Sequence, residues 1–359
     1  MDFSLTPEHA MVQKMVRDFV AKEVYPTIKE YDRKQEMNPA VLPRMAELGI
    51  LGICIPVKYG GQGFDYITLG LVCEELEVVD TSLRVVMSVH MGLNSMALLQ
   101  WGTEEQKQRF LVPQAKGEKV AMFGLTEPGV GSDVANMSST ARRDGSDYII
   151  NGEKMWISLA TKAHHILWFA RTDPHAPDPH DRITAFMIET DRPGVTCGDI
   201  HGKLGVRAGS TGWVNCKDVR VPVSHRIGEE GEGFRIAMSC LDNGRYTVGA
   251  GAVGLIRASL EASVKYAKER KAFGKEIGKH QLIQQKIARM VRDYEIGRLL
   301  YLKAGWMKNM GLRNSRGAII YEGTSEIHQI MQAGYALGYR ADGELRCELP
   351  KYDEKVWRG

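Results

Sequence analysis

The residue best suited to acid–base chemistry in this 359-residue chain lies near the C-terminus, where Tyr321, Glu322, Gly323 and Thr324 follow one another. A carboxylate removes a weakly acidic proton efficiently when it is held against that proton and shielded from water, because shielding raises its pKa toward neutrality. Glu322 is our candidate for such a base. A glutamate beside a glycine is also typical of a solvated loop, so this hypothesis needs support from other segments.

A second candidate segment, Gly124–Asp133, follows an apolar run that is typical of a strand. It is rich in residues that expose backbone N–H groups, and Thr126 and Ser132 add hydroxyls. Such a loop is suited to hydrogen-bonding the polar edge of a cofactor or substrate. By itself it is more often only a turn. Trp156 favours the functional interpretation, because its broad ring could cover a flat cofactor.

A third segment, Gly249–Gly254, has the spacing G-x-G-x-x-G, and Glu269 lies where an acidic ribose ligand would be expected. The motif binds a dinucleotide only after a strand, because its first glycine turns the chain from sheet to helix beneath the pyrophosphate. Here Asp242–Tyr246 precede it, and apolar residues at helical spacing run through the glycines. The pattern therefore predicts close helix packing and argues against an NAD-dependent dehydrogenase.

Helices are expected to carry the first third of the chain. Thr6 and Pro7 predict the start of a helix, and apolar residues recur at helical spacing until Pro26. Further helices are expected over residues 41–48, 66–79 and 82–101.

From about Val120 the pattern changes to short runs of β-branched and aromatic residues, which predict strands over residues 147–150, 165–170, 184–189 and 213–221. Turns are expected at Asp144–Gly145 and Asn151–Gly152. Beyond Gly233 the helical spacing returns, with one apolar stripe over residues 248–264 and another over 283–294. The predicted fold class is α+β and multidomain, with a helical domain (1–119), a barrel-like β domain (120–228) and a helical bundle (229–359).

Composition and charge exclude several kinds of function. The apolar fraction of 43% and charged fraction of 25% are those of a globular protein, and a net charge of +3 without a basic stripe argues against a nucleic-acid partner. The six cysteines and ten histidines show no metal-binding spacing, so no bound metal is expected. Neither a leader peptide nor an apolar stretch of spanning length is evident, so we expect a cytoplasmic location without a membrane span.

Taken together, the chain resembles the acyl-CoA dehydrogenase family. Four segments carry the resemblance, in the same order along the chain: Gly124–Asp133, Lys154–Ser158, Glu269–Gly274 and Tyr321–Thr324. The resemblance covers nearly the whole chain. It implies an FAD enzyme that oxidises a short-chain acyl-CoA to its enoyl form, passes electrons to an electron-transfer flavoprotein and assembles as a homotetramer or dimer.

The resemblance also implies roles for individual residues. Glu322 would be the catalytic base, with Gly323 beside it in the substrate site. The flavin ring would contact Phe123, Leu125, Thr126, Trp156, Ile157 and Ser158, while Thr324 and Glu326 would close over it. The adenine half of FAD would bind Arg270, Ala272, Phe273 and Gln281. In this family these residues usually come from a neighbouring subunit, across the subunit interface. Ser132, assigned to both the cofactor and the substrate site, would hold the coenzyme A arm together with Asp242 and Arg245.

One departure from the family bears on activity. Only Leu312–Ile320 lie between the end of the last long helix and Tyr321, where family members carry another long helix and a glycine-rich loop that touches the FAD pyrophosphate. The shortened C-terminal domain would leave an apolar stripe of the last long helix uncovered and remove backbone donors for FAD. The alternative function is therefore a non-catalytic acyl-CoA-binding or scaffold relative that has lost productive FAD binding.

Arg84 has two interpretations. Asp80 and Thr81 predict a helix start, and an arginine in the first turn opposes the helix dipole, so a compensating anion is expected, with Glu77 as the ordinary candidate. The run Glu77–Arg84 also resembles the glutaryl-CoA dehydrogenase branch, in which the matching arginine holds the substrate's distal carboxylate. On that analogy Arg84 would select a dicarboxylyl thioester.

Overall fold

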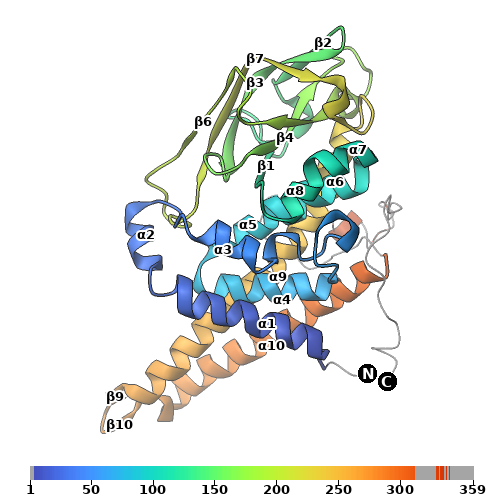
Figure 1. The fold of residues 1–359 in the computed structure, drawn as a ribbon. Helices are drawn as coiled ribbons and strands as arrows, with labels where there is room; N and C mark the ends of the chain where they lie inside the picture. Colours follow the sequence, from blue (N-terminus) through green and yellow to red (C-terminus); the bar gives the residue numbers. More distant parts are fainter. Residues whose placement is uncertain (1–3, 312–328, 331, 335–336, 338, 340–359) are drawn as a thin grey trace.

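The computed structural model describes residues 4–311, 329–330, 332–334, 337 and 339. A β-sheet lies on one side of a body of helices, and a long helical hairpin extends from that body away from the sheet (Figure 1). The helices that precede the sheet in the chain and those that follow it lie together. The predicted fold class, helical then β then helical, is confirmed, while the exact domain limits stay predictions.

Helices carry residues 7–115, as predicted for this part of the chain. Thr6 caps the first helix by accepting a hydrogen bond from the backbone N–H of His9 at 3.2 Å, and Pro7 is its first residue. The elements are α1 (Pro7–Phe19), η1 (Val20–Val24), α2 (Ile28–Lys34), α3 (Val41–Glu47), η2 (Ile50–Gly52), η3 (Val57–Tyr59), α4 (Tyr66–Val79), α5 (Thr81–Val86), η4 (Met87–Ser95), α6 (Met96–Trp101), α7 (Glu104–Gln106), η5 (Lys107–Leu111) and α8 (Val112–Ala115). Most of α4 is buried, so this helix forms the centre of the helical body.

The sheet has the strand order β6-β7-β3-β2-β4-β5-β8, and β1 pairs parallel with β4. Its strands are β1 (Ala121–Gly124), β2 (Thr140–Asp144), β3 (Asp147–Ser158), β4 (His165–Arg171), β5 (Ile183–Glu189), β6 (Val195–Asp199), β7 (Thr211–Pro222) and β8 (Arg226–Ile227), with the short helices η6 (Val134–Asn136), η7 (Pro179–Arg182) and η8 (Val223–His225) between them. The predicted turn at Asp144–Gly145 joins β2 to β3. The turn predicted at Asn151–Gly152 is wrong, because these residues lie within β3 at a bulge.

Two long helices follow the sheet and form the hairpin. Its elements are α9 (Gly233–Glu269), β9 (Lys271–Ala272), β10 (Lys275–Glu276), η9 (Ile277–Lys279) and α10 (Gln281–Asn309). The Gly249–Gly254 segment lies inside α9 with helix before it, so the motif is helical packing, as predicted. A Cβ at Gly254 would lie 2.1 Å from the carbonyl oxygen of Glu74, which shows why α9 and α4 need a glycine there. The predicted apolar stripe of α9 is only partly correct, because Leu255 is exposed and Val253 is buried instead.

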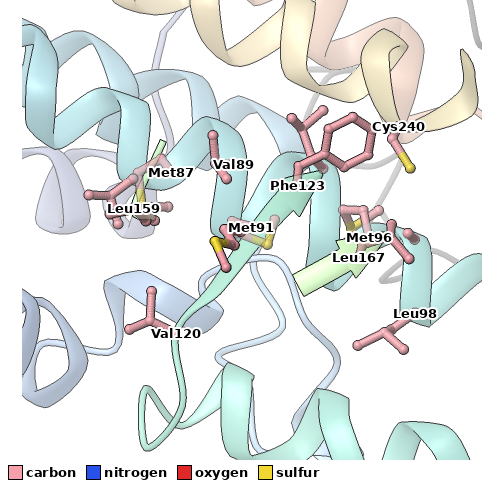
Figure 2. Close-up of a cluster of buried hydrophobic side chains, with 14 of the residues drawn as sticks. Met87, Val89, Met91, Met96, Leu98, Val120, Phe123, Leu159, Leu167 and Cys240 are labelled. Carbon is pink, nitrogen blue, oxygen red and sulfur yellow. The ribbon is translucent and has the colours of Figure 1, made fainter. Parts of the chain in front are cut away.

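A hydrophobic core joins the helical body to the sheet. Figure 2 shows Met87, Val89 and Met91 of η4 and Phe123 of β1 in one cluster of buried side chains, with Met87 beside Leu159 and Phe123 beside Cys240 of α9. Leu159, directly after β3, belongs to the same core. The end of β1 and the end of β3 are therefore fixed by packing against the helices, and both ends carry residues of the predicted site.

The outer side of α10 carries exposed apolar side chains: Leu282, Val291, Ile296, Leu299, Leu300, Trp306 and Met310. The members of the stripe predicted over residues 283–294 are half-buried, and these exposed apolar side chains lie at other positions of the helix. A patch of this kind marks a surface that favours association.

Candidate functional site

Trp156 lies at a break in the ladder between β3 and β7. Met155 pairs with Trp213 and Ile157 pairs with the adjacent Gly212, so Trp156 has no partner in the register. Its backbone is left-handed, with φ at 61°, and its side chain is 60% exposed. A bulge of this kind re-aims a side chain, and a bulky residue with positive φ persists only where its surroundings impose it. The strand thus presents the indole ring outward.

The segment after β1 is tied to β3 beside Trp156. The backbone N–H of Met155 donates to the carbonyl oxygen of Thr126 at 2.9 Å, and Glu127 and Val130 exchange backbone hydrogen bonds at 3.0 and 3.1 Å. Phe123, Leu125 and Ile157 are buried, whereas Thr126 and Ser158 are half-buried and Ser132 is exposed. The buried side chains of Phe123, Leu125 and Ile157 therefore hold the two segments in place, while the residues that carry hydroxyls remain accessible.

A cavity of about 460 Å³ lies beside Trp156 and Ser158. Helix α5 contributes Ser82 and Val85 to its wall. The segment before β7 contributes residues 203–206, 209 and 210. The complete lining is Met37, Ser82, Val85, Trp156, Ser158, Leu159, Lys203, Leu204, Gly205, Val206, Gly209, Ser210 and Thr211. Mostly apolar walls with a few polar groups are typical of a site for a flat organic ligand.

Ser82 belongs to the wall of this cavity, but its hydroxyl oxygen is itself buried: it lies beside Asp80, and a Cβ at Gly209 would lie 2.9 Å from it. The hydroxyl is therefore not presented to a ligand. The outward indole of Trp156, the half-buried Ser158 and the mostly apolar lining fit the ring system of FAD, and the half-buried Thr126 lies on the adjacent segment. Sequence reasoning missed Ser82 and the 203–211 segment, since their proximity to Trp156 depends on tertiary packing.

Arg84 forms a buried ion pair with Glu77. Its Nε lies 2.6 Å from Glu77 Oε2, and both side chains are buried. A Cβ at Gly251 would lie 2.8 Å from both Arg84 Cγ and Glu77 Oε2, which places the pair against α9. The residues that line the cavity from α5 are Ser82 and Val85, and Arg84 is not among them. The contact between Arg84 and the anion expected from the sequence is therefore present.

The residues assigned to the coenzyme A arm come from two parts of the chain. Asp242 and Arg245 lie one turn apart on α9, and Arg245 Nη1 is 3.2 Å from Asp242 Oδ1. Ser132 lies on the exposed loop after β1. Their assignment to coenzyme A stays a prediction.

The residues assigned to the adenine half of FAD lie outside the cavity beside Trp156. Arg270, Ala272, Phe273 and Gln281 cluster at the tip of the α9–α10 hairpin, where β9 and β10 pair (Figure 1). Phe273 is 95% exposed, with φ at 50°, and Arg270 and Gln281 are exposed as well. Figure 1 shows this tip at the opposite end of the molecule from the sheet. One chain thus does not bring the two predicted halves of the FAD site together.

Glu322, Gly323, Thr324 and Glu326 lie outside the described residues, so their roles stay predictions. Within the described part of the chain, no group of histidine, cysteine and acidic side chains could hold a metal ion. None of the described helices has the length and apolar character that a membrane crossing requires.

Family models for acyl-CoA dehydrogenases match three successive parts of the chain: the N-terminal domain at residues 6–118, the middle domain at 122–219 and the C-terminal domain at 231–312. A probable acyl-CoA dehydrogenase, YngJ of Bacillus subtilis, is 40% identical over 86% of this chain and 81% of its own length. The mitochondrial short-chain specific acyl-CoA dehydrogenase of Bos taurus is 35% identical over 94% of this chain and 92% of its own length.

The solved structure of a glutaryl-coenzyme A dehydrogenase in complex with glutaryl-CoA is similar over its whole length. It superposes with a TM-score of 0.91 at 33% identity and covers 97% of this chain and 100% of the other. The similarity therefore extends through all three parts of the chain.

This chain is shorter than a relative to which it aligns, while the place of the missing residues stays a prediction. The alignment with the bovine relative spans 382 positions, more than the 359 residues of this chain, so the relative has residues without a counterpart here. The C-terminal family model stops matching at residue 312, where the predicted shortening begins.

Proposed function

The chain belongs to the acyl-CoA dehydrogenase family of flavoprotein oxidoreductases, and on that premise we propose that it binds FAD and oxidises a short-chain acyl-CoA to the enoyl-CoA. An electron-transfer flavoprotein would accept the electrons. The observation that carries the proposal is the mostly apolar cavity beside the outward-turned indole of Trp156, with Ser158 in its wall.

Each residue of the proposed site would have a separate role in the reaction. Glu322 would remove the proton from the carbon next to the thioester, and hydrogen bonds to the carbonyl oxygen would stabilise the developing enolate by about 3 kcal/mol each. FAD, when bound, supplies the acceptor for the hydride that leaves the next carbon. Trp156 would cover the ring, Thr126 and Ser158 would offer hydroxyls to its edge, and the apolar walls would exclude water and thereby keep the base reactive.

The visible spectrum of the purified protein tests this proposal. A bound oxidised flavin gives an absorption band at about 450 nm that is retained after gel filtration. The second candidate function, a non-catalytic acyl-CoA-binding relative, is favoured by the absent pyrophosphate loop. On this alternative, the purified protein is colourless and stays colourless after incubation with free FAD. It nevertheless binds butyryl-CoA, which calorimetry measures.

Substrate choice between monocarboxylyl and dicarboxylyl thioesters can be tested at Arg84. Because Arg84 pairs with buried Glu77 and does not line the cavity, we expect Arg84→Ala to change the ratio of glutaryl-CoA to butyryl-CoA turnover by less than about twofold. Stability should fall by about 3 kcal/mol, since the substitution leaves a buried carboxylate without its partner. The measurements are kcat/KM for both substrates and urea unfolding. A tenfold or greater fall in the ratio would instead assign Arg84 to a distal carboxylate and make glutaryl-CoA the proposed substrate.

We further propose that two copies complete each FAD site. The residues assigned to the ring lie at the ends of β1 and β3, which pack against the helices, and those assigned to the adenine half lie at the tip of the hairpin that extends away from the sheet, so a second copy would supply the missing half. The exposed apolar side chains of α10 provide a surface for association.

Mixing two variants tests this shared site. Trp156→Ala and Arg270→Ala should each lose most bound FAD. In an assembly made of one variant alone, every site has a defect in one of its two halves. When the two are unfolded and refolded together, about half of the pairs are mixed and each carries one intact site, so about a quarter of the wild-type flavin should return. Flavin absorbance per chain after gel filtration gives the result. Recovery no greater than the average of the two separate variants would show that each chain builds its own site.

A further inference from the structure

Glu127 and Lys154 form a buried ion pair between the two segments that we assign to the flavin ring. Lys154 Nζ lies 2.8 Å from Glu127 Oε1, and the two side chains are 0% and 1% exposed. Glu127 directly follows Thr126 on the loop after β1, and Lys154 lies two residues before Trp156 on β3. No role was predicted for either residue from the sequence.

The ion pair is the centre of a small network that reaches several points of the loop. Lys154 Nζ also donates to the carbonyl oxygen of Leu125 at 3.1 Å and lies 5.1 Å from the centre of the Trp168 ring. Glu127 accepts hydrogen bonds from the backbone N–H and hydroxyl of Ser138 at 2.5 and 2.6 Å, and from the backbone N–H of Ser139 at 3.0 Å. The start and the end of the loop are thereby tied to one strand.

Both groups are charged near neutral pH. Burial by itself would raise the pKa of Glu127, but the Lys154 charge and the hydrogen bonds from Ser138 and Ser139 outweigh burial and lower that pKa to about 2. Burial lowers the pKa of Lys154 to about 8, against the opposing influence of the Glu127 carboxylate. The network is therefore an ion pair under ordinary conditions.

We propose that the Glu127–Lys154 pair positions the flavin-binding face, by fixing the loop that carries Thr126 to the strand that carries Trp156. The inference rests on the proposed function, because the face has a purpose only if FAD binds there. Lys154 anchors β3 two residues before the left-handed backbone at Trp156, and Met155 N–H meets the carbonyl of Thr126 in the same place. Glu127 and Lys154 are positioning residues and need not touch the cofactor.

General stabilisation alone does not account well for the pair. Replacing a buried ion pair by neutral groups of similar size is often neutral or stabilising, because taking both charges out of water offsets their attraction. A pair placed between two ligand-contacting segments is better explained by the single geometry that its hydrogen bonds impose, and a preorganised site binds its ligand more tightly.

The double variant Glu127→Gln/Lys154→Met tests the proposal, because it removes both charges together and keeps similar volumes. We expect the melting temperature to stay within about 4 °C of wild type, while the Kd for FAD, measured by titrating apoprotein, rises at least about tenfold. Acrylamide quenching of Trp156 in the apoprotein should also increase. The difference in emission between each protein and its own Trp156→Phe version isolates this residue.

The matched control is Glu189→Gln/Arg192→Met. It removes a partly exposed ion pair at the end of β5, with Arg192 Nε 2.6 Å from Glu189 Oε2. Glu189 also pairs with Arg109 at 2.8 Å, and neither control residue lines the cavity beside Trp156. We expect the FAD affinity and the quenching of Trp156 to be unchanged. If both double variants weaken FAD equally, or if the Glu127 and Lys154 variant binds FAD like wild type, the proposal is overturned.

A milder variant keeps the test decisive if the double variant does not fold. Ser138→Ala removes one hydrogen bond to Glu127 from an exposed side chain, and should weaken FAD by about threefold with unchanged melting, whereas wild-type affinity would count against the proposal. Failure of the proposed function is distinguishable, because wild-type apoprotein would then bind no FAD. In that case Trp156 quenching alone decides whether the pair sets the position of the ring.

Discussion

Glu322→Gln should retain bound FAD and lose substrate oxidation by a factor on the order of 10³ or more, because an amide cannot accept the proton that a positioned carboxylate removes. The substitution preserves size and hydrogen-bonding shape, so the flavin band at about 450 nm should remain. The rate at which butyryl-CoA bleaches that band in the absence of oxygen measures the effect directly, without a redox partner.

Glu326→Gln is the comparison for this experiment. Glu326 lies four residues further along the same segment and is predicted to contact the cofactor, so its variant should change FAD affinity more than the bleaching rate of flavin-loaded protein. Normal bleaching by Glu322→Gln, or loss of bleaching in Glu326→Gln alone, would move the base away from Glu322.

The second large effect concerns stability and lies in the helical body. Arg257 of α9 contacts two buried carboxylates of α4: its Nη1 is 2.9 Å from Glu74 and its Nη2 is 2.6 Å from Glu75. Tyr294 and Tyr301 of α10 donate hydrogen bonds to Glu74, at 3.2 and 2.5 Å. This network therefore joins α4 to both long helices of the C-terminal part.

Arg257→Met should lower the free energy of unfolding by about 3 kcal/mol, the lower end of the usual cost of breaking a buried ion pair, because Glu75 keeps Arg17 at 2.8 Å and Glu74 keeps Arg298 at 3.8 Å. Although burial opposes protonation, Glu75 and Glu74 hold the pKa of Arg257 above its usual value, which is consistent with a charged group at this position. Urea unfolding monitored by circular dichroism provides the measurement.

Arg292→Met on α10 is the matched control for Arg257→Met, since Arg292 pairs with Asp293 at the exposed surface. Exposed pairs contribute roughly 0–1 kcal/mol, so little change is expected. Equal destabilisation by the two substitutions would show that the Glu74 and Glu75 cluster is not the stabilising element.

The local pattern of the sequence was sufficient to predict most elements. The span predicted for α4 agrees with the structure, and Thr6 caps α1 as expected, because a cap and an apolar repeat act within a few residues. The Asn151–Gly152 turn was wrong because the same dipeptide also suits a bulge within a long strand, and only pairing with β7 distinguishes the two.

Site prediction was limited in a different way. The segments around Thr126 and Trp156 were identified through family resemblance, and the structure brings them together at a hydrogen bond between Met155 and Thr126. The Glu127–Lys154 pair, by contrast, could not be predicted from the sequence, since charged residues at these positions of a strand and a loop are ordinarily exposed. Only the folded structure shows that the side chains of Glu127 and Lys154 are both buried.

The shortening predicted near residues 312–320 would be the main obstacle to the proposed activity. The α9–α10 hairpin carries the residues assigned to the adenine half of FAD, and the segments at the ends of β1 and β3 carry those assigned to the ring. Loss of backbone donors to the pyrophosphate would remove favourable contacts from the most charged part of FAD. We therefore expect FAD to bind more weakly than it would if the absent loop were present, with the remaining affinity coming from the two retained halves.

Anaerobic titration of the purified protein with butyryl-CoA tests the central claim most directly. If this chain binds FAD beside Trp156 and oxidises a short-chain thioester, the band at about 450 nm should bleach as substrate is added, and crotonyl-CoA should form in proportion to the flavin reduced. A protein that holds FAD but shows no bleaching with short-chain or glutaryl thioesters, or one that takes up no FAD at all, would contradict the account.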